Sequence, residues 1–336
     1  MKRSSLFFLM LTVSASYCSQ ATATECTFDS TSGTIPKTFT LPAQTIFIDA
    51  DAPNDTTKAI ATYDTSTQGT DVSFHNCTTA DIYGKDTSLT TTQNPQTKLF
   101  PTSIPGISMK VLWNNGAAFG DFPSQGNMSW ENSSTLGRWV YPGASYFRVQ
   151  FFKTADTLDL SSHDGDQVIP AEAVAYTWAT ISRTVVQSLN IGKIEVVSTP
   201  SCSYESSKTV DFNTVSSRTL TSAGIDRNLN FNILCKTDYG NYSATASLSS
   251  DNKTDDNNYI KVSDANGSDD VLAIKISDSS GNIIKTDGSS SETIDNVKSG
   301  SSADFKWIAT LVSLSGSKKP ANGNFSSNAE ITLQVK

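Results

Sequence analysis

The chain has 336 residues, and its 33 Asp and Glu against 25 Lys and Arg give a formal net charge of −8. So acidic a chain has no electrostatic basis for coating nucleic acid or an anionic membrane, which excludes both as partners. Ser, Thr and Asn together number 112, whereas charged residues make up only 17% of the chain. Solubility that rests on hydroxyls and amides is typical of exported β-structure and not of a cytosolic helical enzyme.

Residues 1–23 have the three parts of an export signal. Lys2 and Arg3 are basic, residues 6–13 are apolar, and Ala21-Thr22-Ala23 supplies the small-x-small pattern of a cleavage site. The mature chain is therefore expected to begin at Thr24. A lipoprotein signal that ends at Cys18 is the alternative, and the bulky Tyr17 before it disfavours that interpretation. The apolar stretch is shorter than the ~20 residues that a membrane helix needs.

Four cysteines remain after this cleavage: Cys26, Cys77, Cys202 and Cys235. An even number of cysteines in an exported chain predicts disulfides, here with three possible connectivities. Pairing Cys26 with Cys77 and Cys202 with Cys235 is favoured, because each bond then stays within one domain. A zinc site is the competing interpretation. It is disfavoured because the spacings are long and no Cys-x-x-Cys pair is present.

The expected fold class is all-β, with two β-sandwiches (immunoglobulin-like or jelly-roll-like) in series. Apolar and polar residues alternate with a period of two in residues 147–151, 228–233, 272–276 and 329–336. Turn signals separate such runs at Asn115-Gly116, Pro142-Gly143, Asn266-Gly267, Gly281-Asn282 and Asp287-Gly288. Many short strands joined by polar turns are typical of sandwiches.

The boundary between the two domains is expected near Ser198-Thr199-Pro200. Residues 193–197 read as a strand that ends there, and proline does not continue a strand. All prolines except Pro320, and four of the five tryptophans, lie at or before residue 200. The chain is thus divided into the signal (1–23), a first domain (24–198) and a second domain (199–336).

No catalytic constellation is found in the sequence. The two histidines differ in setting: His75 lies on a predicted strand, and His163 lies in a polar turn. No nucleophile elbow, zinc-protease, P-loop or dinucleotide motif is present. The segment 264–267 is similar to the start of a calcium loop, but it lacks the closing acidic residue, so a plain turn is favoured. We expect no enzyme, cofactor or metal, although a paired-carboxylate glycosidase stays open because any fold can bring two carboxylates together.

Several motifs carry a resemblance to a known family. Cys26 follows the signal at once, and Pro200-Ser201-Cys202-Ser203 opens the second domain. The predicted strand Val210-Asp211-Phe212, a cysteine that closes residues 228–235, and the segment 323–329 before a final alternating strand come next. In this order the motifs resemble the two-domain tip adhesins of chaperone–usher fimbriae, of the type 1 and type 3 kind. Val335-Lys336 stands where many pilins carry a Tyr, which is a departure.

The resemblance implies that residues 199–336 form an incomplete pilin-type sandwich that lacks its last strand and accepts one from the next subunit. The groove for this strand is expected between the strand that carries Val210 and Phe212 and the final strand, with Ala329, Ile331, Leu333 and Val335. Only Thr24 and Glu25 precede Cys26, too few for a strand to donate, so the subunit is expected at the fibre tip. A complete sandwich is the alternative.

By the same resemblance, residues 24–198 bind the receptor. Sugar sites combine polar side chains with an exposed aromatic ring, and the glycine-rich segment 121–138, read as loops, offers Asp121, Gln125, Asn127, Trp130, Asn132 and Arg138, with Trp139 next. A second group after Cys77 comprises Asp81, Tyr83 and Asp86, with the free amine of Thr24. The Asn-Asp pair of the mannose-binding branch is absent, so mannose specificity is not carried over. The alternative is that both tryptophans are core residues.

The sequence therefore predicts a fimbrial tip adhesin, exported through the periplasm to the fimbrial tip at the cell surface. The expected partners are a periplasmic fimbrial chaperone, the outer-membrane usher, the next fimbrial subunit and a host receptor. A glycan is the expected receptor, and a matrix protein such as collagen stays open. A structural fimbrial subunit without a receptor is the alternative function.

Overall fold

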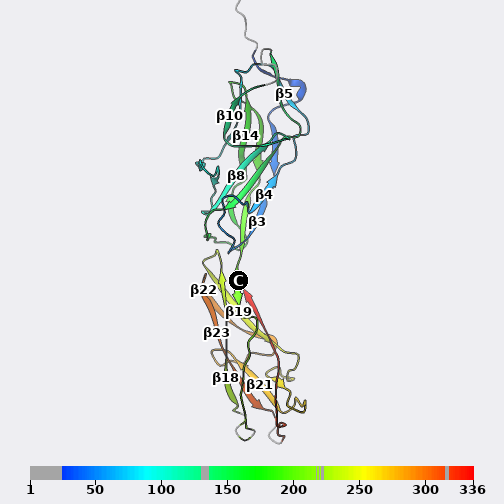
Figure 1. Cartoon of the computed structure of the whole chain (residues 1–336), viewed down its shortest axis with the longest axis vertical. Helices are drawn as coiled ribbons and strands as arrows, with labels where there is room; N and C mark the ends of the chain where they lie inside the picture. Colours follow the sequence, from blue (N-terminus) through cyan, green and yellow to red (C-terminus); the bar gives the residue numbers. More distant parts are fainter. Residues whose placement is uncertain (1–24, 130–135, 217, 219, 221–222, 315–317) are drawn as a thin grey trace, which may run out of the picture.

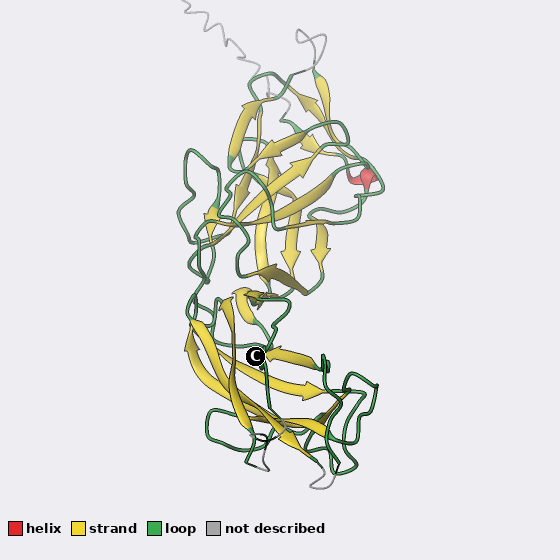
Figure 2. Ribbon diagram, turned by 60° about the horizontal axis from the view of Figure 1, so that its bottom comes forward, coloured by secondary structure: helices red, strands yellow, loops and turns green. Residues whose placement is uncertain are grey.

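The computed structural model describes residues 25–129, 136–216, 218, 220, 223–314 and 318–336. Two β-rich bodies lie end to end along the long axis, and the C-terminus lies beside their junction (Figure 1). Regular structure is almost entirely strand (Figure 2), apart from the short 3-10 helix η1 (Ser30–Ser32). The predicted fold class, all-β with two sandwiches in series, is confirmed. Within these ranges, no helix has the length and apolar character needed to cross a membrane.

The first body carries strands β1 to β16. Two five-stranded arrangements have the orders β10-β6-β14-β15-β2 and β4-β12-β8-β7, the latter with β9 beside β8, and smaller sheets have the orders β1-β5-β11 and β13-β16-β3. The strands are β1 (Thr27–Phe28), β2 (Lys37–Leu41), β3 (Gln44–Asp49), β4 (Ala61–Asp64), β5 (Val72–Cys77), β6 (Ile82–Thr87), β7 (Phe100–Pro101), β8 (Ile107–Asn114), β9 (Phe119–Asp121), β10 (Ser124–Asn127), β11 (Gly137–Tyr141), β12 (Tyr146–Lys153), β13 (Asp166–Ile169), β14 (Glu172–Ala179), β15 (Thr184–Ile191) and β16 (Ile194–Thr199).

Period-two alternation builds the core of this body. Along β12, the side chains of Phe147, Val149 and Phe151 are fully buried, whereas Arg148 and Gln150 alternate with them and face outward. A second, smaller cluster surrounds the disulfide between Cys26 and Cys77, which is the pairing expected from the sequence.

The second body is built from β17 to β24 in two sheets, β17-β18-β23-β21-β20 and β22-β19-β24. Trp307 and Phe305 are buried at the centre of its core, and the expected disulfide Cys202–Cys235 joins β17 to β18. The strands are β17 (Ser201–Tyr204), β18 (Ile225–Lys236), β19 (Asn241–Ser249), β20 (Ile260–Val262), β21 (Leu272–Ser277), β22 (Asp287–Lys298), β23 (Ser302–Ser313) and β24 (Glu330–Val335).

Three local expectations are wrong. Val210-Asp211-Phe212 is not a strand, because none of the described strands pairs with this segment and burial of Phe212 holds it instead. Asp287-Gly288 opens β22 and does not form a turn. The glycine-rich segment 121–138 is not a set of loops throughout, since it contains β10 and parts of β9 and β11; glycine fits a strand where a neighbouring group lies close.

The two bodies meet through a buried carboxylate. Asp238 of the second body accepts hydrogen bonds from the backbone N–H of Leu158 (2.8 Å) and the hydroxyl of Ser198 (2.6 Å). The Tyr239 hydroxyl accepts from the backbone N–H of Ser198 (3.0 Å), and the Tyr239 ring lies 4.0 Å from that of His163. His163, predicted as part of a polar turn, is thus an exposed turn residue at this junction.

Candidate functional site

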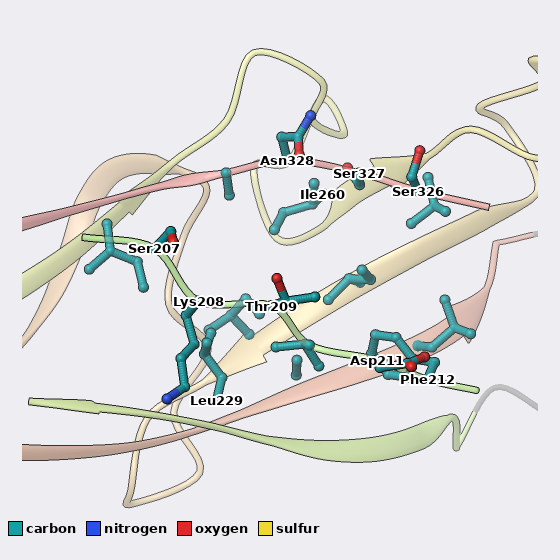
Figure 3. A pocket seen from close by; sticks show the side chains of 18 of the residues that line it. Ser207, Lys208, Thr209, Asp211, Phe212, Leu229, Ile260, Ser326, Ser327 and Asn328 are labelled. Carbon is teal, nitrogen blue, oxygen red and sulfur yellow. The ribbon is translucent and has the colours of Figure 1, made fainter. Parts of the chain in front are cut away.

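A long groove opens along the second body and exposes part of its core. Its volume is about 1670 Å³, and apolar residues of both sheets line it, among them Leu229, Ile260, Ile274 and Leu333. Figure 3 shows residues 326–328 along one side and residues 207–212 along the other, with Ile260 between them. All six predicted groove residues line it: Val210, Phe212, Ala329, Ile331, Leu333 and Val335.

Strand β24 forms one wall of the groove and is the edge of its sheet. It pairs with β19 on one side, and among the described strands none pairs with the other side. Ile331, Leu333 and Val335 are half-buried and pack against the core, whereas Glu330, Thr332 and Gln334 are exposed. The apolar side chains of β24 therefore face the groove at an edge that could still pair.

The hydrogen-bond ladder shows which backbone groups of β24 are available. Lys336 and Ser243 exchange both backbone hydrogen bonds, at 2.9 and 3.0 Å. Bonded and non-bonded positions alternate in an antiparallel pair, so the N–H groups of Ile331, Leu333 and Val335 point away from β19. The groove thus presents both apolar side chains and unpaired backbone N–H groups along the same strand edge.

In the first body, the predicted residues after Cys77 are divided between two environments. Asp81 is buried and accepts from the N–H of Thr78 (2.7 Å), which shapes the turn before β6. The Tyr83 ring lies 4.4 Å from the Trp139 ring, and both pack against the small cluster around the disulfide. Trp139 is thus half-buried in packing, as the alternative interpretation of the tryptophans held, and is not an exposed ring on a loop.

The remaining described candidates are spread over the surface. Asp121 forms an ion pair with Lys110 at 3.0 Å. Asn127 donates to the carbonyl of Thr79 at 3.0 Å, and Arg138 is exposed on β11. Three candidates, Thr24, Trp130 and Asn132, lie outside the described residues.

Asp86 and Gln125 are brought together by a residue that was not among the candidates, Arg183. Its guanidinium lies 3.7 Å from the carboxylate of Asp86 and donates to the side-chain carbonyl of Gln125 at 3.2 Å. The same guanidinium lies 4.4 Å from the centroid of the Trp178 ring. Arg183 comes from the turn after β14, where its φ is 54°.

These side chains lie on the face of the sheet opposite to Tyr83. Along β6, Gly84 and Asp86 alternate with Tyr83 and Lys85, and in the ladder Gly84 pairs with Trp178 and Asp86 with Tyr176. Burial raises the pKa of the Tyr176 hydroxyl, and the nearby Asp86 carboxylate raises it further, whereas Arg183 opposes the shift. The sequence carried one signal for this cluster, the alternation of Tyr176 and Trp178 along one strand face.

A shallow cleft of about 370 Å³ also opens on the first body. Lys110, Gln150 and Phe152 of the sheet and residues of the loops 56–57 and 96–97 line it. Within the described part of the chain, no group of three or more His, Cys, Asp or Glu could hold a metal ion.

The domain that holds the groove is similar to a known protein family. Residues 191–336 match the family model for fimbrial proteins, and this match confirms the predicted fimbrial resemblance for the domain that holds the groove. No curated protein sequence matches the chain.

Several solved structures are similar to the chain. A chain of the CsuC–CsuE chaperone–tip adhesion subunit pre-assembly complex of Acinetobacter baumannii is 11% identical over 89% of this chain and 99% of that chain, with a TM-score of 0.39. The CupB6 tip adhesin of Pseudomonas aeruginosa is 12% identical over 92% and 94%, with a TM-score of 0.35. The receptor-binding domain of the MrkD1P adhesin of Klebsiella pneumoniae is 14% identical over 53% and 96%, with a TM-score of 0.34.

Proposed function

We propose that this protein is a fimbrial tip adhesin: residues 24–198 bind a receptor, and residues 199–336 anchor the subunit by accepting a donor strand. The groove beside β24 is the observation that carries the proposal. It combines an apolar floor with the unpaired edge of a strand, which is what β-strand addition requires.

The dimensions of the groove fit a strand better than a small molecule. Its lining runs from Cys202 and Tyr204 to Val335 and draws on both sheets, so an inserted strand would contact the core along its length. Alternating apolar residues of that strand would cover Leu229 and Ile260, while its backbone would pair with β24. In this proposal the donor comes first from a periplasmic chaperone and then, at the outer-membrane usher, from the next subunit.

The tip position and the receptor belong to the same proposal. The expected mature start at Thr24 leaves only Thr24 and Glu25 before Cys26, so in this proposal the subunit accepts a strand without donating one. The first domain then projects from the end of the fibre at the cell surface and binds non-covalently, without catalysis. A host glycan is the proposed receptor.

A self-complemented variant tests the strand-accepting function. A flexible linker followed by a strand of alternating Val, Ile and Thr is appended after Lys336, and the chain is expressed in a periplasm without a fimbrial chaperone. We expect a soluble monomer with a raised Tm, whereas the unmodified mature chain aggregates or is degraded. The matched control carries Asn at each apolar position of the appended strand. Equal solubility and Tm for all three forms would contradict the proposal.

A further inference from the structure

The cluster around Arg183 is unusual because it buries a tryptophan on the outward face of a sheet. Trp178 is 1% exposed, yet it belongs to none of the three apolar core clusters of the described residues. Its ring packs onto Gly84, where any Cβ would overlap the indole. The side of the sheet that carries Tyr83 already contributes to the interior, so Trp178 is a buried aromatic ring on the face where polar side chains are usual.

The guanidinium of Arg183, which stacks on this indole, is charged and weakly held. The Arg183 side chain is 53% exposed, and its nearest polar partners lie at 3.2 Å (Gln125) and 3.7 Å (Asp86). These distances are longer than those of strong charge-assisted hydrogen bonds, which are about 2.7–2.9 Å. A ligand with better-placed hydroxyls can therefore take over the contacts of Arg183 without breaking a strong ion pair.

The polar groups beside the indole match the chemistry of a sugar. A carboxylate accepts from hydroxyls, a guanidinium donates to them, and a side-chain amide does both. The half-buried Tyr176 lies next to Asp86 in the ladder and adds an aromatic ring with a polar tip. The indole N–H of Trp178 has no hydrogen-bond acceptor among the described residues, so a ligand oxygen that reached it would satisfy a buried donor.

The charges at the cluster indicate an uncharged ligand. Asp86 and Arg183 neutralise each other, and the chain as a whole carries a net charge of −8. An acidic sugar would approach the Asp86 carboxylate against the electrostatic repulsion of a negatively charged chain. A neutral sugar meets donors and acceptors without that cost, and it reaches the Trp178 ring once the Arg183 side chain moves aside.

We propose that Asp86, Gln125, Tyr176, Trp178 and Arg183 form the receptor-binding site, and that they bind an uncharged pyranose unit of a glycan. The site lies on the outer face of β10, β6 and β14, next to the turn that carries Arg183. This inference rests on the proposed adhesin function and specifies where and what the first domain binds.

Glycan binding by the full mature chain, purified together with its chaperone, tests this assignment. An array of neutral, sialylated and sulfated oligosaccharides is probed with the wild type, Asp86→Asn and Arg183→Ala. Arg148→Ala is the matched control, because Arg148 also stacks on an aromatic ring (Phe119, 4.4 Å) and pairs with an aspartate (Asp64, 2.7 Å) elsewhere on this body. Thermal unfolding verifies that each variant is folded.

We expect wild-type binding to a neutral glycan, a loss of about tenfold or more in affinity for each site variant, and wild-type affinity for Arg148→Ala. Binding should also shift the tryptophan emission of the wild type, since the cover over Trp178 moves. If Arg183→Ala does not fold, the conservative Asp86→Asn variant decides alone.

Two results would overturn the site and leave the adhesin function standing. One is unchanged glycan affinity in Asp86→Asn and Arg183→Ala; the other is selective binding of acidic glycans. If no glycan binds but fimbriated cells attach to immobilised collagen through this subunit, the glycan site is wrong and the receptor is a protein. If such cells attach to neither, the adhesin function fails as well.

Discussion

At the scale of single residues, Gly84 determines whether the Trp178 ring fits beneath Arg183, because a larger side chain has no room there. A Cβ at this position would overlap the Trp178 ring and lie 2.7 Å from the carbonyl oxygen of Ser124. We expect Gly84→Ala to destabilise the first domain by about 1–3 kcal/mol, the usual cost of overpacking. Urea unfolding followed by tryptophan fluorescence measures this change.

The matched control is Gly126→Ala on the neighbouring strand β10. A Cβ there would lie 3.5 Å from the Tyr83 ring, an ordinary contact. The control should unfold at the wild-type urea concentration. If Gly84→Ala did the same, the indole would not be confined by this glycine.

One carboxylate of the second body links stability to pH. Hydrogen bonds from the backbone N–H groups of Ala321, Asn266 and Ser268 hold the pKa of Asp264 below its usual value. Because the folded-state pKa is depressed, the stabilisation is present above the unfolded-state pKa of ~3.9 and is lost as the pH falls through the folded value. We expect the urea midpoint of the wild type to drop more steeply than that of Asp264→Asn below about pH 4. Asp251→Asn, at an exposed position of the same domain, should follow the wild type.

At the scale of elements, the segment opposite β24 is held by side-chain burial and not by a ladder. Phe212 is 4% exposed, although residues 205–215 form no strand. We expect Phe212→Ala to destabilise the second domain by about 3–5 kcal/mol and to speed proteolysis within residues 205–215. Tyr204→Ala is the control, because that ring is 63% exposed. Equal cleavage rates in both variants would show that burial of Phe212 does not hold the segment.

The same elements show what could be predicted from the sequence. Alternation along β12, β18 and β24 identifies the strands and their buried faces, because the period of two is a local property. The segment at Val210 has a similar local pattern, but strand structure also needs a partner, which the sequence does not supply. Period and turn signals therefore predicted the fold class and over-predicted one strand, whereas the groove was expected only from the family resemblance.

The candidate receptor site was less predictable for a related reason. Asp86 and Gln125 were singled out for their chemistry, but Arg183 lies 58 residues beyond Gln125, and only the pairing of β10, β6 and β14 brings them together. Trp139 was predicted as exposed on a loop; it lies on β11 and packs on Tyr83. Composition identifies such side chains, and sheet order decides which of them meet.

At the scale of the whole molecule, the junction makes the two bodies depend on each other. Asp238 is 1% exposed and bonds to Leu158 and Ser198 of the first body. We expect Asp238→Ala to cost about 1–3 kcal/mol, because the buried N–H of Leu158 loses its acceptor. The backbone N–H of Leu160 donates to the backbone carbonyl of Asp238 at 2.9 Å, so the amides of both Leu158 and Leu160 should then exchange hydrogen faster.

The control for the junction is Asp256→Ala. Asp256 accepts from Thr254 and Asn258 within one loop of the second body, so its loss should leave the exchange of Leu158 and Leu160 unchanged. Unchanged exchange in Asp238→Ala as well would contradict a junction held by this carboxylate.

The central claim is that the groove accepts a strand alongside β24, and amide hydrogen exchange of the self-complemented chain tests it most directly. The amides of Thr332 and Gln334 face β19 and serve as the internal reference. The account predicts that the amides of Ile331, Leu333 and Val335 are protected to the same degree as this reference, because the appended strand pairs with them. Near-free exchange at these three positions, with Thr332 and Gln334 still protected, would contradict it.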